Sequence, residues 1–132
     1  VKAPYGPYAE NLRHVLEHVE GYYISGFSDE GDRPDLKLEL CENATKLAKE
    51  YLDSDKETLE RFDKVTTLVQ GFESPLGVEL LATVHWVAKR ESATSFDKVV
   101  AQIRKWNVRK RNIPERHIKI AFEALNEHGW LN

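Results

Sequence analysis

Several residue types on which protein chemistry depends are scarce in this sequence. Among its 132 residues there is no methionine and only one cysteine, Cys41. A single cysteine can form neither an internal disulfide nor a cysteine-based zinc site, and such usage is typical of the reducing cytoplasm. Because methionine is missing even at the first residue, we expect the chain to be a segment of a longer protein.

The sequence also lacks long hydrophobic runs. No apolar stretch approaches the roughly 18–20 residues that a membrane-spanning helix needs, and the first residues do not form a signal peptide. Hydrophobic residues make up 41% of the chain and charged residues 31%, which is typical of a soluble globular protein. We therefore expect residues 1–132 to form a single cytoplasmic helical domain without membrane contact.

Catalytic signatures are absent too. The sequence contains no Ser/His/Asp arrangement, no glycine-rich phosphate loop and no dinucleotide fingerprint. We therefore expect this chain to have no catalytic residue, no cofactor and no enzymatic activity of its own.

What the chain does have is an uneven distribution of charge. Residues 1–63 carry 8 Lys/Arg against 15 Asp/Glu, whereas residues 64–132 carry 11 against 7. The two parts therefore have net charges of −7 and +4. Such asymmetry indicates either solvated faces or separate binding surfaces.

Helical periodicity dominates, and the sequence predicts an all-α fold, a compact bundle of about six helices. The expected helices cover residues 7–20, 43–53, 56–70, 75–90, 95–106 and 114–128. Start signals are Pro75 after Ser74, the capping pair Thr94 and Asp97, and Pro114. The last three helices resemble a winged helix, although a seven-residue connection, 107–113, is long for a helix-turn-helix.

Apolar residues recur at the helical spacing of three and four, which predicts a buried face on each helix. The residues expected to be buried are Leu12, Val15, Leu16 and Val19; Leu47, Ala48, Tyr51 and Leu52; Leu59, Phe62, Val65 and Val69; Phe96, Val99, Val100, Ile103 and Trp106; and Ile118, Ala121, Phe122 and Leu125. The helix over 75–90 is apolar nearly all round, so we expect it at the centre of the core.

One small β-hairpin is expected near residues 22–40. The stretch YYISGF (22–27) is aromatic and β-branched, and LKLEL (36–40) alternates apolar and charged residues. The residues between them, SDEGDRPD (28–35), have the composition of a loop.

One motif resembles that of a zinc peptidase. His14, Glu17 and His18 follow the order H-x-x-E-H. On a helical wheel both histidines lie opposite the apolar face, and no third ligand stands out downstream. We interpret the match as a solvated helix face and expect no metal.

The acidic loop is a second candidate. It contains four carboxylates, Asp29, Glu30, Asp32 and Asp35, and three aromatic residues precede it, Tyr22, Tyr23 and Phe27. The order of the carboxylates does not fit a calcium-binding loop. The segment is therefore either a solvated turn or a mimic of single-stranded nucleic acid, with carboxylates standing for phosphates and rings for bases.

Two further surfaces carry polar residues at regular spacing. One is a stripe on the helix over 75–90, made of Glu79, Thr83, Trp86 and Arg90, which suits either a protein interface or packing under another helix. His85 lies off this stripe and is interpreted as a packed histidine. The other is a basic region, Arg104–Lys119, made of Arg104, Lys105, Arg109, Lys110, Arg111, Arg116 and Lys119, which could bind DNA or simply complement helix dipoles.

Three stretches together resemble a known family. They are YGPYAENLRHVLEHVEGYYISGFSDEGDRPD (5–35), GFESPLGVELLATVHWVA (71–88) and IPERHIKIAFEALNEHGWL (113–131). They resemble the C-terminal domain of DarG-type antitoxins, which are DNA ADP-ribosyl glycohydrolases that carry an N-terminal macro domain. The resemblance implies that this chain neutralises a DarT-type toxin, an ADP-ribosyltransferase acting on single-stranded DNA, while the macro domain in the parent chain removes ADP-ribose.

Combined with the residue patterns, this resemblance predicts an antitoxin domain that acts by mimicking single-stranded DNA. The expected partner contacts are Tyr22, Tyr23, Phe27, Asp29, Glu30, Asp32 and Asp35, with Glu73, Trp86 and Arg90 as further candidates. The alternative is a winged-helix-like DNA-binding module that uses the basic Arg104–Lys119 region, and a third option is a tail that dimerises the parent protein.

Overall fold

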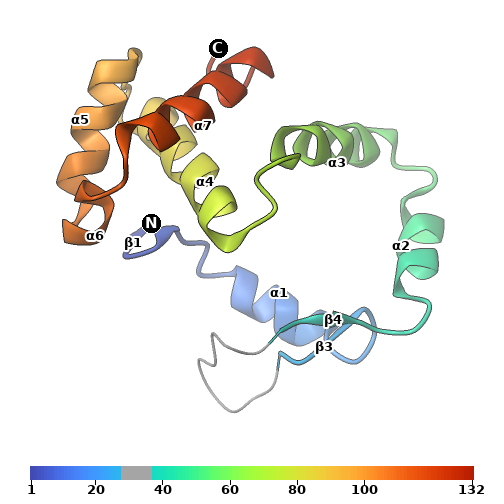
Figure 1. Cartoon of the computed structure of the whole chain (residues 1–132). Coiled ribbons are helices and arrows are strands. Elements are labelled where there is room, and N and C mark those ends of the chain that lie inside the picture. The colour runs from blue at the N-terminus through green and yellow to red at the C-terminus, as the bar shows by residue number, and fades with distance from the viewer. Residues whose placement is uncertain (28–36) are drawn as a thin grey trace. The chain divides into compact units, whose positions relative to one another are not determined.

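The structure is a computed structural model that describes residues 1–27 and 37–132. Its helices are α1 (Leu12–Val19), α2 (Ala44–Leu52), α3 (Lys56–Val69), α4 (Pro75–Arg90), α5 (Phe96–Trp106), α6 (Val108–Arg111) and α7 (Glu115–Glu127) (Figure 1). Within the described ranges the strands form two short antiparallel hairpins, β1 (Lys2–Ala3) with β2 (Gly6–Pro7), and β3 (Ile24–Ser25) with β4 (Glu39–Leu40). The predicted mainly helical fold class is confirmed.

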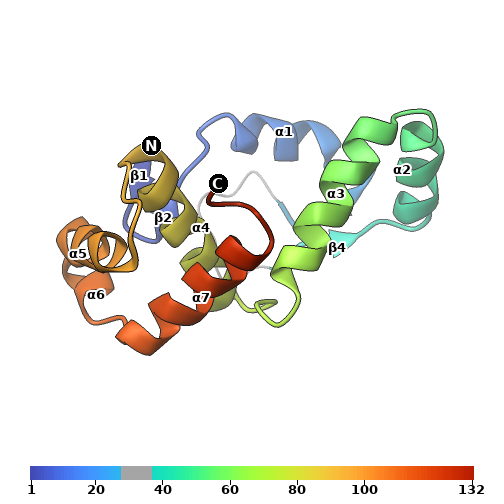
Figure 2. The same cartoon turned by 90° about the horizontal axis from the view of Figure 1, so that it is seen from above.

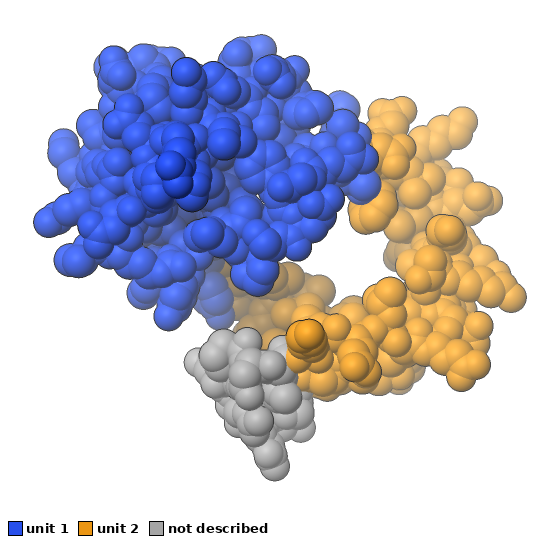
Figure 3. Space-filling view, viewed as in Figure 1, with its two compact units in different colours: residues 1–8, 64–132 blue, residues 9–63 orange. Residues whose placement is uncertain are grey.

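The chain divides into two units, which Figure 3 colours separately. Unit 1 consists of residues 1–8 and 64–132, and unit 2 consists of residues 9–63. Unit 1 therefore combines the first eight residues with the second half of the chain. Each unit is described below by itself.

The core of unit 1 lies between α4, α5 and α7. Helix α4 packs against both other helices, and Figure 2 shows α4 and α7 side by side. The fully buried apolar side chains include Val84 and Val87 of α4, Ile103 of α5 and Ile118 of α7. The predicted central position of the helix over 75–90 is confirmed, as are the buried faces predicted for α5 and α7.

Local side-chain contacts explain where these helices begin. Ser74 accepts a hydrogen bond from the backbone N–H of Gly77 at 3.0 Å, and Pro75 follows at the first helical position. Ser95 rather than the predicted Thr94 caps α5, because its hydroxyl accepts from the N–H of Lys98 at 3.5 Å. The predicted start of α5 was therefore wrong by one residue.

The first helix is shorter than the sequence predicts. It begins at Leu12 instead of residue 7, because residues 1–8 form the β1–β2 hairpin. Gly6 has a φ of +145°, which side-chain-bearing residues rarely adopt, and so permits the tight return of the chain. A four-residue helix, α6, also occupies part of the connection expected between α5 and α7.

The one hairpin that the sequence predicts, near residues 22–40, is confirmed in unit 2. Ile24 pairs with Leu40 and Ser25 pairs with Glu39. The N–H of Cys41 extends the pairing by donating to the carbonyl of Tyr23 at 3.0 Å. Residues 28–36 between the strands lie outside the described residues.

The apolar faces predicted for the first three helices were wrong in part. Leu16, Val19, Ala48, Leu52, Leu59 and Val69 are half-buried, whereas Leu12, Val15, Leu47, Tyr51, Phe62 and Val65 are exposed. The physical reason is that the described elements of unit 2 bury few of each other's side chains, so unit 2 has little core of its own, whereas Val69 of unit 1 packs against the core of that unit. Periodicity indicates that a face prefers to be covered, but it does not say what covers it.

Among the described residues, none of the helices combines the length and the apolar character that crossing a bilayer requires.

Candidate functional site

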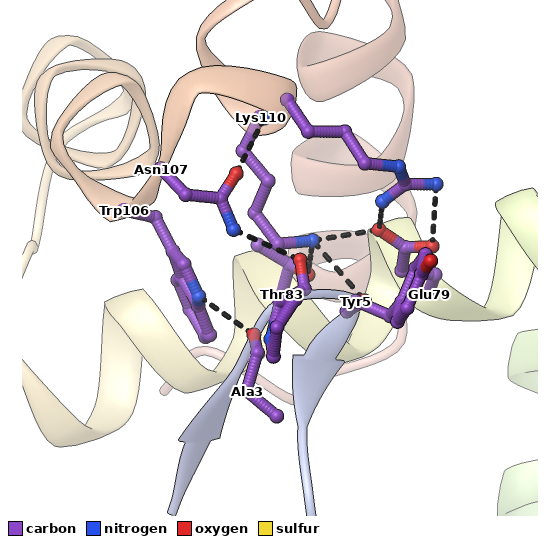
Figure 4. A network of polar contacts seen from close by, with 9 residues as sticks. Ala3, Tyr5, Glu79, Thr83, Trp106, Asn107 and Lys110 are labelled. Atoms are coloured by element: carbon purple, nitrogen blue, oxygen red, sulfur yellow. Dashed lines mark hydrogen bonds and ion pairs between the residues drawn. The ribbon is translucent and has the colours of Figure 1, made fainter. Parts of the chain in front are cut away.

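The most extensive polar network in the described residues surrounds the buried side chain of Lys110. Its Nζ donates to the Tyr5 carbonyl at 3.2 Å, to Glu79 Oε1 at 2.7 Å and to Thr83 Oγ1 at 3.0 Å (Figure 4). The side chain has no exposed area. A lysine ammonium has three N–H donors, and here all three are satisfied. This cation therefore stabilises the fold and has no donor left for a ligand.

Glu79 also forms an ion pair with a second cation, Arg109, whose side chain is partly exposed. Both terminal nitrogens of Arg109 donate to the Glu79 carboxylate, one of them at 3.1 Å. Although burial alone would raise the pKa of Glu79, the hydrogen bonds and charges of Arg109 and Lys110 lower it below the usual range. The hydrogen bonds with Glu79 in turn raise the pKa of Arg109, whose guanidinium also lies 4.8 Å from the centre of the Tyr5 ring.

Two neighbouring residues bind the β1–β2 hairpin through its backbone. Trp106 Nε1 donates to the Ala3 carbonyl at 3.0 Å, and Asn107 Nδ2 donates to the Pro4 carbonyl at 2.9 Å. Asn107 Oδ1 also caps α6 by accepting from the Lys110 N–H at 2.8 Å. We call this set the hairpin clamp and define it as Glu79, Thr83, Trp106, Asn107, Arg109 and Lys110.

The hairpin clamp changes the interpretation of the basic region. Lys110 is buried and Arg109 forms an ion pair with Glu79. Arg104 donates to the backbone carbonyls of Arg111 and Ile113, the latter at 2.7 Å. Three of the seven basic side chains are therefore engaged within unit 1. The other four, Lys105, Arg111, Arg116 and Lys119, are exposed.

The predicted aromatic contacts differ in how accessible they are. Tyr22 is 73% exposed, whereas Tyr23 and Phe27 are half-buried. The four acidic candidates, Asp29, Glu30, Asp32 and Asp35, lie outside the described residues. Tyr22 is thus the ring of this segment that is most available to a partner.

The stripe predicted on α4 divides into two parts. Glu79 and Thr83 belong to the hairpin clamp, so for them packing beneath other elements is the correct alternative. Trp86 is half-buried, and the exposed Arg90 lies 5.7 Å from the centre of its ring. Glu73 is exposed just before α4. Glu73, Trp86 and Arg90 remain candidate contacts on unit 1.

His85 packs as expected against another side chain. Its ring meets that of Trp130 edge-to-face, with centroids 5.9 Å apart and an interplanar angle of 82°. Burial and, to a lesser degree, the positive charge of Lys89 lower the pKa of His85. The neutral imidazole is therefore the form that this packing favours.

The H-x-x-E-H residues lie on an exposed helix face. Glu17 accepts from Arg13 Nε at 3.1 Å and contacts His14 Nδ1 at 3.3 Å. The side chain of His14 is 76% exposed. Across residues 1–27 and 37–132, no group of three or more His, Cys, Asp or Glu side chains is arranged to hold a metal ion.

Sequence reasoning missed the role of the hairpin clamp. Lys110 was assigned to a basic surface because its three acceptors are 27 to 105 residues away in the sequence. One local signal was present: Asn107 is a preferred N-cap residue placed directly after the end of α5. It predicts the short helix, but not the hairpin that the helix binds.

Comparison with known proteins identifies relatives of almost the whole chain. A protein named DNA ADP-ribosyl glycohydrolase from Thermus aquaticus is 37% identical over 129 residues, which are 96% of this chain and 35% of that protein. Proteins of the same name from Mycobacterium bovis and Mycobacterium tuberculosis are each 39% identical over 127 residues, covering 92% of this chain and 36% of their own length. No family model matches the sequence.

The chain spans about a third of the length of the curated relatives that it matches. Besides the matched portion, each relative has almost twice as many further residues, and the activity in its name is that of the whole protein. The chain is therefore homologous, along nearly its whole length, to one portion of the DNA ADP-ribosyl glycohydrolases, which confirms the resemblance predicted from its sequence.

Proposed function

We propose that this chain is the antitoxin domain of a DarG-type protein and that it binds and inhibits a DarT-type DNA ADP-ribosyltransferase toxin. Its homology to DNA ADP-ribosyl glycohydrolases supports the family context. In this proposal the glycohydrolase chemistry belongs to the macro domain of the parent chain, and the present chain contributes binding alone.

The segregation of charge between the two units carries the proposal. Unit 2 contains 7 Lys/Arg and 15 Asp/Glu, a net charge of −8, whereas unit 1 has a net charge of +5. An enzyme that binds single-stranded DNA presents a positively charged groove with aromatic side chains on which bases stack. An acidic unit with an exposed ring at Tyr22 is complementary to such a groove.

The proposed mechanism is occupation of the DNA-binding groove of the toxin. Tyr22, Tyr23 and Phe27 act as ring contacts, with Tyr22 the most accessible of them. The carboxylates of Asp29, Glu30, Asp32 and Asp35 stand in for phosphates. Complementary charge accelerates association. The rings that become buried in the interface determine the dissociation rate of the complex. Glu73, Trp86 and Arg90 form a secondary contact.

The basic region gives the alternative function less support. A DNA-binding surface needs cations that are free to reach phosphates. Arg104, Arg109 and Lys110 instead bind carbonyl and carboxylate groups of unit 1. We therefore assign these three residues to holding the fold of unit 1, which leaves four exposed cations for this alternative.

The test is capture of the toxin by this chain in the absence of DNA. The DarT-type protein encoded beside the parent gene is immobilised, and binding is measured at about 50 mM and 200 mM salt. We expect binding at the lower salt concentration that weakens at the higher one, because screening reduces the attraction between exposed charges. Absence of binding at both concentrations would contradict the proposed function.

A charge-matched pair of variants tests the mimicry itself. Asp29, Glu30, Asp32 and Asp35 are replaced by Asn or Gln in one variant, and Asp97, Glu115, Glu123 and Glu127 in the other. Both variants lose four negative charges, but the control residues are exposed on unit 1. We expect weaker, less salt-sensitive binding for the loop variant alone. Equal affinities for the two variants would show that only overall charge matters.

A further inference from the structure

Unit 2 exposes an unusual amount of apolar surface for its size. Eight of its large apolar side chains are between 46% and 80% exposed, and they are Leu12, Val15, Tyr22, Leu38, Leu40, Leu47, Tyr51 and Phe62. Ala44 is the one residue of the described ranges 9–27 and 37–63 that is more than nine-tenths buried. A stretch of about 50 residues without a core is at the margin of independent stability.

The exposed apolar residues lie at regular positions on the helices. Leu12 and Val15 are three residues apart on α1, and Leu47 and Tyr51 are four residues apart on α2. These spacings place each pair on one face of its helix. Helix α1 contains no buried residue, although its polar and apolar residues are sharply segregated. Both faces therefore have the pattern of a covered surface, and the described residues of unit 2 itself do not cover them.

The charge of unit 2 determines what can cover these faces. Its net charge of −8 disfavours contact with unit 2 of a second copy and with an anionic lipid surface, since like charges repel. Unit 1 of a second copy has the opposite charge, but three of its cations, Arg104, Arg109 and Lys110, are engaged internally, and light scattering tests this second copy as an alternative. A foreign protein with an apolar centre and a cationic rim fits both the exposed faces and the charge.

We propose that unit 2 completes its fold on a cationic protein partner, which covers the apolar faces of α1 and α2. This inference rests on the proposed function, since the partner used to test it is the toxin. It goes further by stating that binding and folding of unit 2 are coupled, while unit 1 is folded beforehand. Coupled folding lowers affinity per area of interface but allows an extended contact.

Hydrogen exchange of the full chain, alone and with the toxin, tests the coupling. In the free chain we expect the amides of α1 and α2 to exchange within about a minute, while those of α4, α5 and α7 stay protected for hours. Addition of the toxin protects α1 and α2. Protection of these two helices in the free chain, equal to that of α4, would overturn the proposal.

A pair of variants on α1 tests which face the partner covers. In the first, Leu12 and Val15 are replaced by Ser; in the control, His14 and His18 on the polar face are replaced by Ser. We expect the first variant to bind the toxin at least about tenfold more weakly and the control to change less than about twofold. Unit 1 is monitored through the protection of α4, so a general loss of folding is recognised.

The outcomes separate this inference from the proposed function. If the toxin does not bind at all, the proposed function fails and this inference fails with it. If the toxin binds while α1 and α2 stay unprotected, or if both variants bind equally, the inference alone is wrong. A dimer of the free chain in light scattering, with α1 and α2 protected, would show that a second copy is the partner instead.

Discussion

A buried lysine is tolerated only when its charge is paired and its donors are satisfied, and Lys110 meets both conditions. Its Nζ lies 2.7 Å from a Glu79 oxygen, and the same nitrogen lies 5.3 Å from the centre of the Trp106 ring. Removal of this one side chain therefore affects the hairpin, α4 and α6 together.

Replacement of Lys110 by Met tests this role with a similar apolar stem. We expect a loss of about 3 kcal/mol in the free energy of unfolding, the lower end for breaking a buried ion pair, because Arg109 still binds Glu79. Urea denaturation followed by circular dichroism measures the loss. The control is Lys119→Met, an exposed lysine whose partner Glu123 is 3.8 Å away and whose removal should change stability by less than about 0.5 kcal/mol. Equal effects of the two changes would mean that the clamp does not stabilise unit 1.

His85 predicts how stability depends on pH. Because its pKa is lower in the folded chain than in the unfolded chain, where it is about 6.5, the unfolded chain takes up a proton first as the solution is acidified. The free energy of unfolding should therefore fall as the pH drops from about 6.5 towards 5.

The variant His85→Asn isolates this contribution. Denaturation midpoints at several pH values are measured for both proteins, and their difference is followed. We expect the wild-type chain to lose more stability than the variant over this range. Parallel pH profiles would contradict the assigned role of His85.

Among the elements, α4 shows how a backbone contact can reverse an ordinary propensity. A Cβ at Gly77 would lie 2.6 Å from the carbonyl oxygen of Phe72, which belongs to the backbone just before the helix. Gly to Ala within a helix normally stabilises by about 1 kcal/mol. Here the start of the helix would have to move instead.

We accordingly expect Gly77→Ala to destabilise unit 1 by about 1–3 kcal/mol, the usual effect of overpacking. Thermal unfolding followed by far-ultraviolet circular dichroism measures the change. The comparison variant is Ala82→Gly at an exposed position of α4, where propensity alone predicts a loss of about 1 kcal/mol. An increase in stability for Gly77→Ala would show that the Phe72 carbonyl can move away at little cost.

How far the elements could be predicted depends on where their determinants lie. The starts of α4 and α7 are encoded locally by Ser74, Pro75 and Pro114, and those helices lie close to where the sequence places them. The β1–β2 hairpin is bound by Trp106, Asn107 and Lys110, which lie about a hundred residues further along the chain, and no local sequence pattern predicts it. The apolar faces of α1 and α2 were read correctly as apolar, but their burial depends on elements that the described residues do not provide.

For the candidate site the same distinction applies. The accessibility of Tyr22 agrees with its predicted role as a contact, although no structural observation tests that role. Lys110 was grouped with a basic surface and its pairing with Glu79 was not predicted, because the two residues are 31 positions apart. The distribution of charge along a sequence thus gives the net charge of a region, but it does not predict which individual ions pair. The winged-helix-like arrangement of the last three helices stays a prediction.

At the scale of the whole molecule, the net charges of the units predict weak binding to DNA. Unit 2 repels phosphates, and unit 1 has fewer free cations than its net charge of +5 implies. A gel shift with nonspecific duplex at low salt should show little retardation. A retarded band that fades steeply as salt is added would contradict this and favour the basic Arg104–Lys119 region as a DNA contact.

The hairpin clamp also has a consequence in time. Three of its side chains bind backbone carbonyls that lie 103 to 105 positions earlier in the chain, so residues 1–8 leave the ribosome long before Trp106, Asn107 and Lys110 exist. At roughly 5–20 residues per second, the delay between synthesis of the hairpin and synthesis of these three clamp residues is about 5 to 20 s. Until then the Ala3, Pro4 and Tyr5 carbonyls lack the donors that bind them in the folded chain. Unit 1 therefore reaches its native state only after α6 has been synthesised, and residues 1–8 have no clamp to bind before that point.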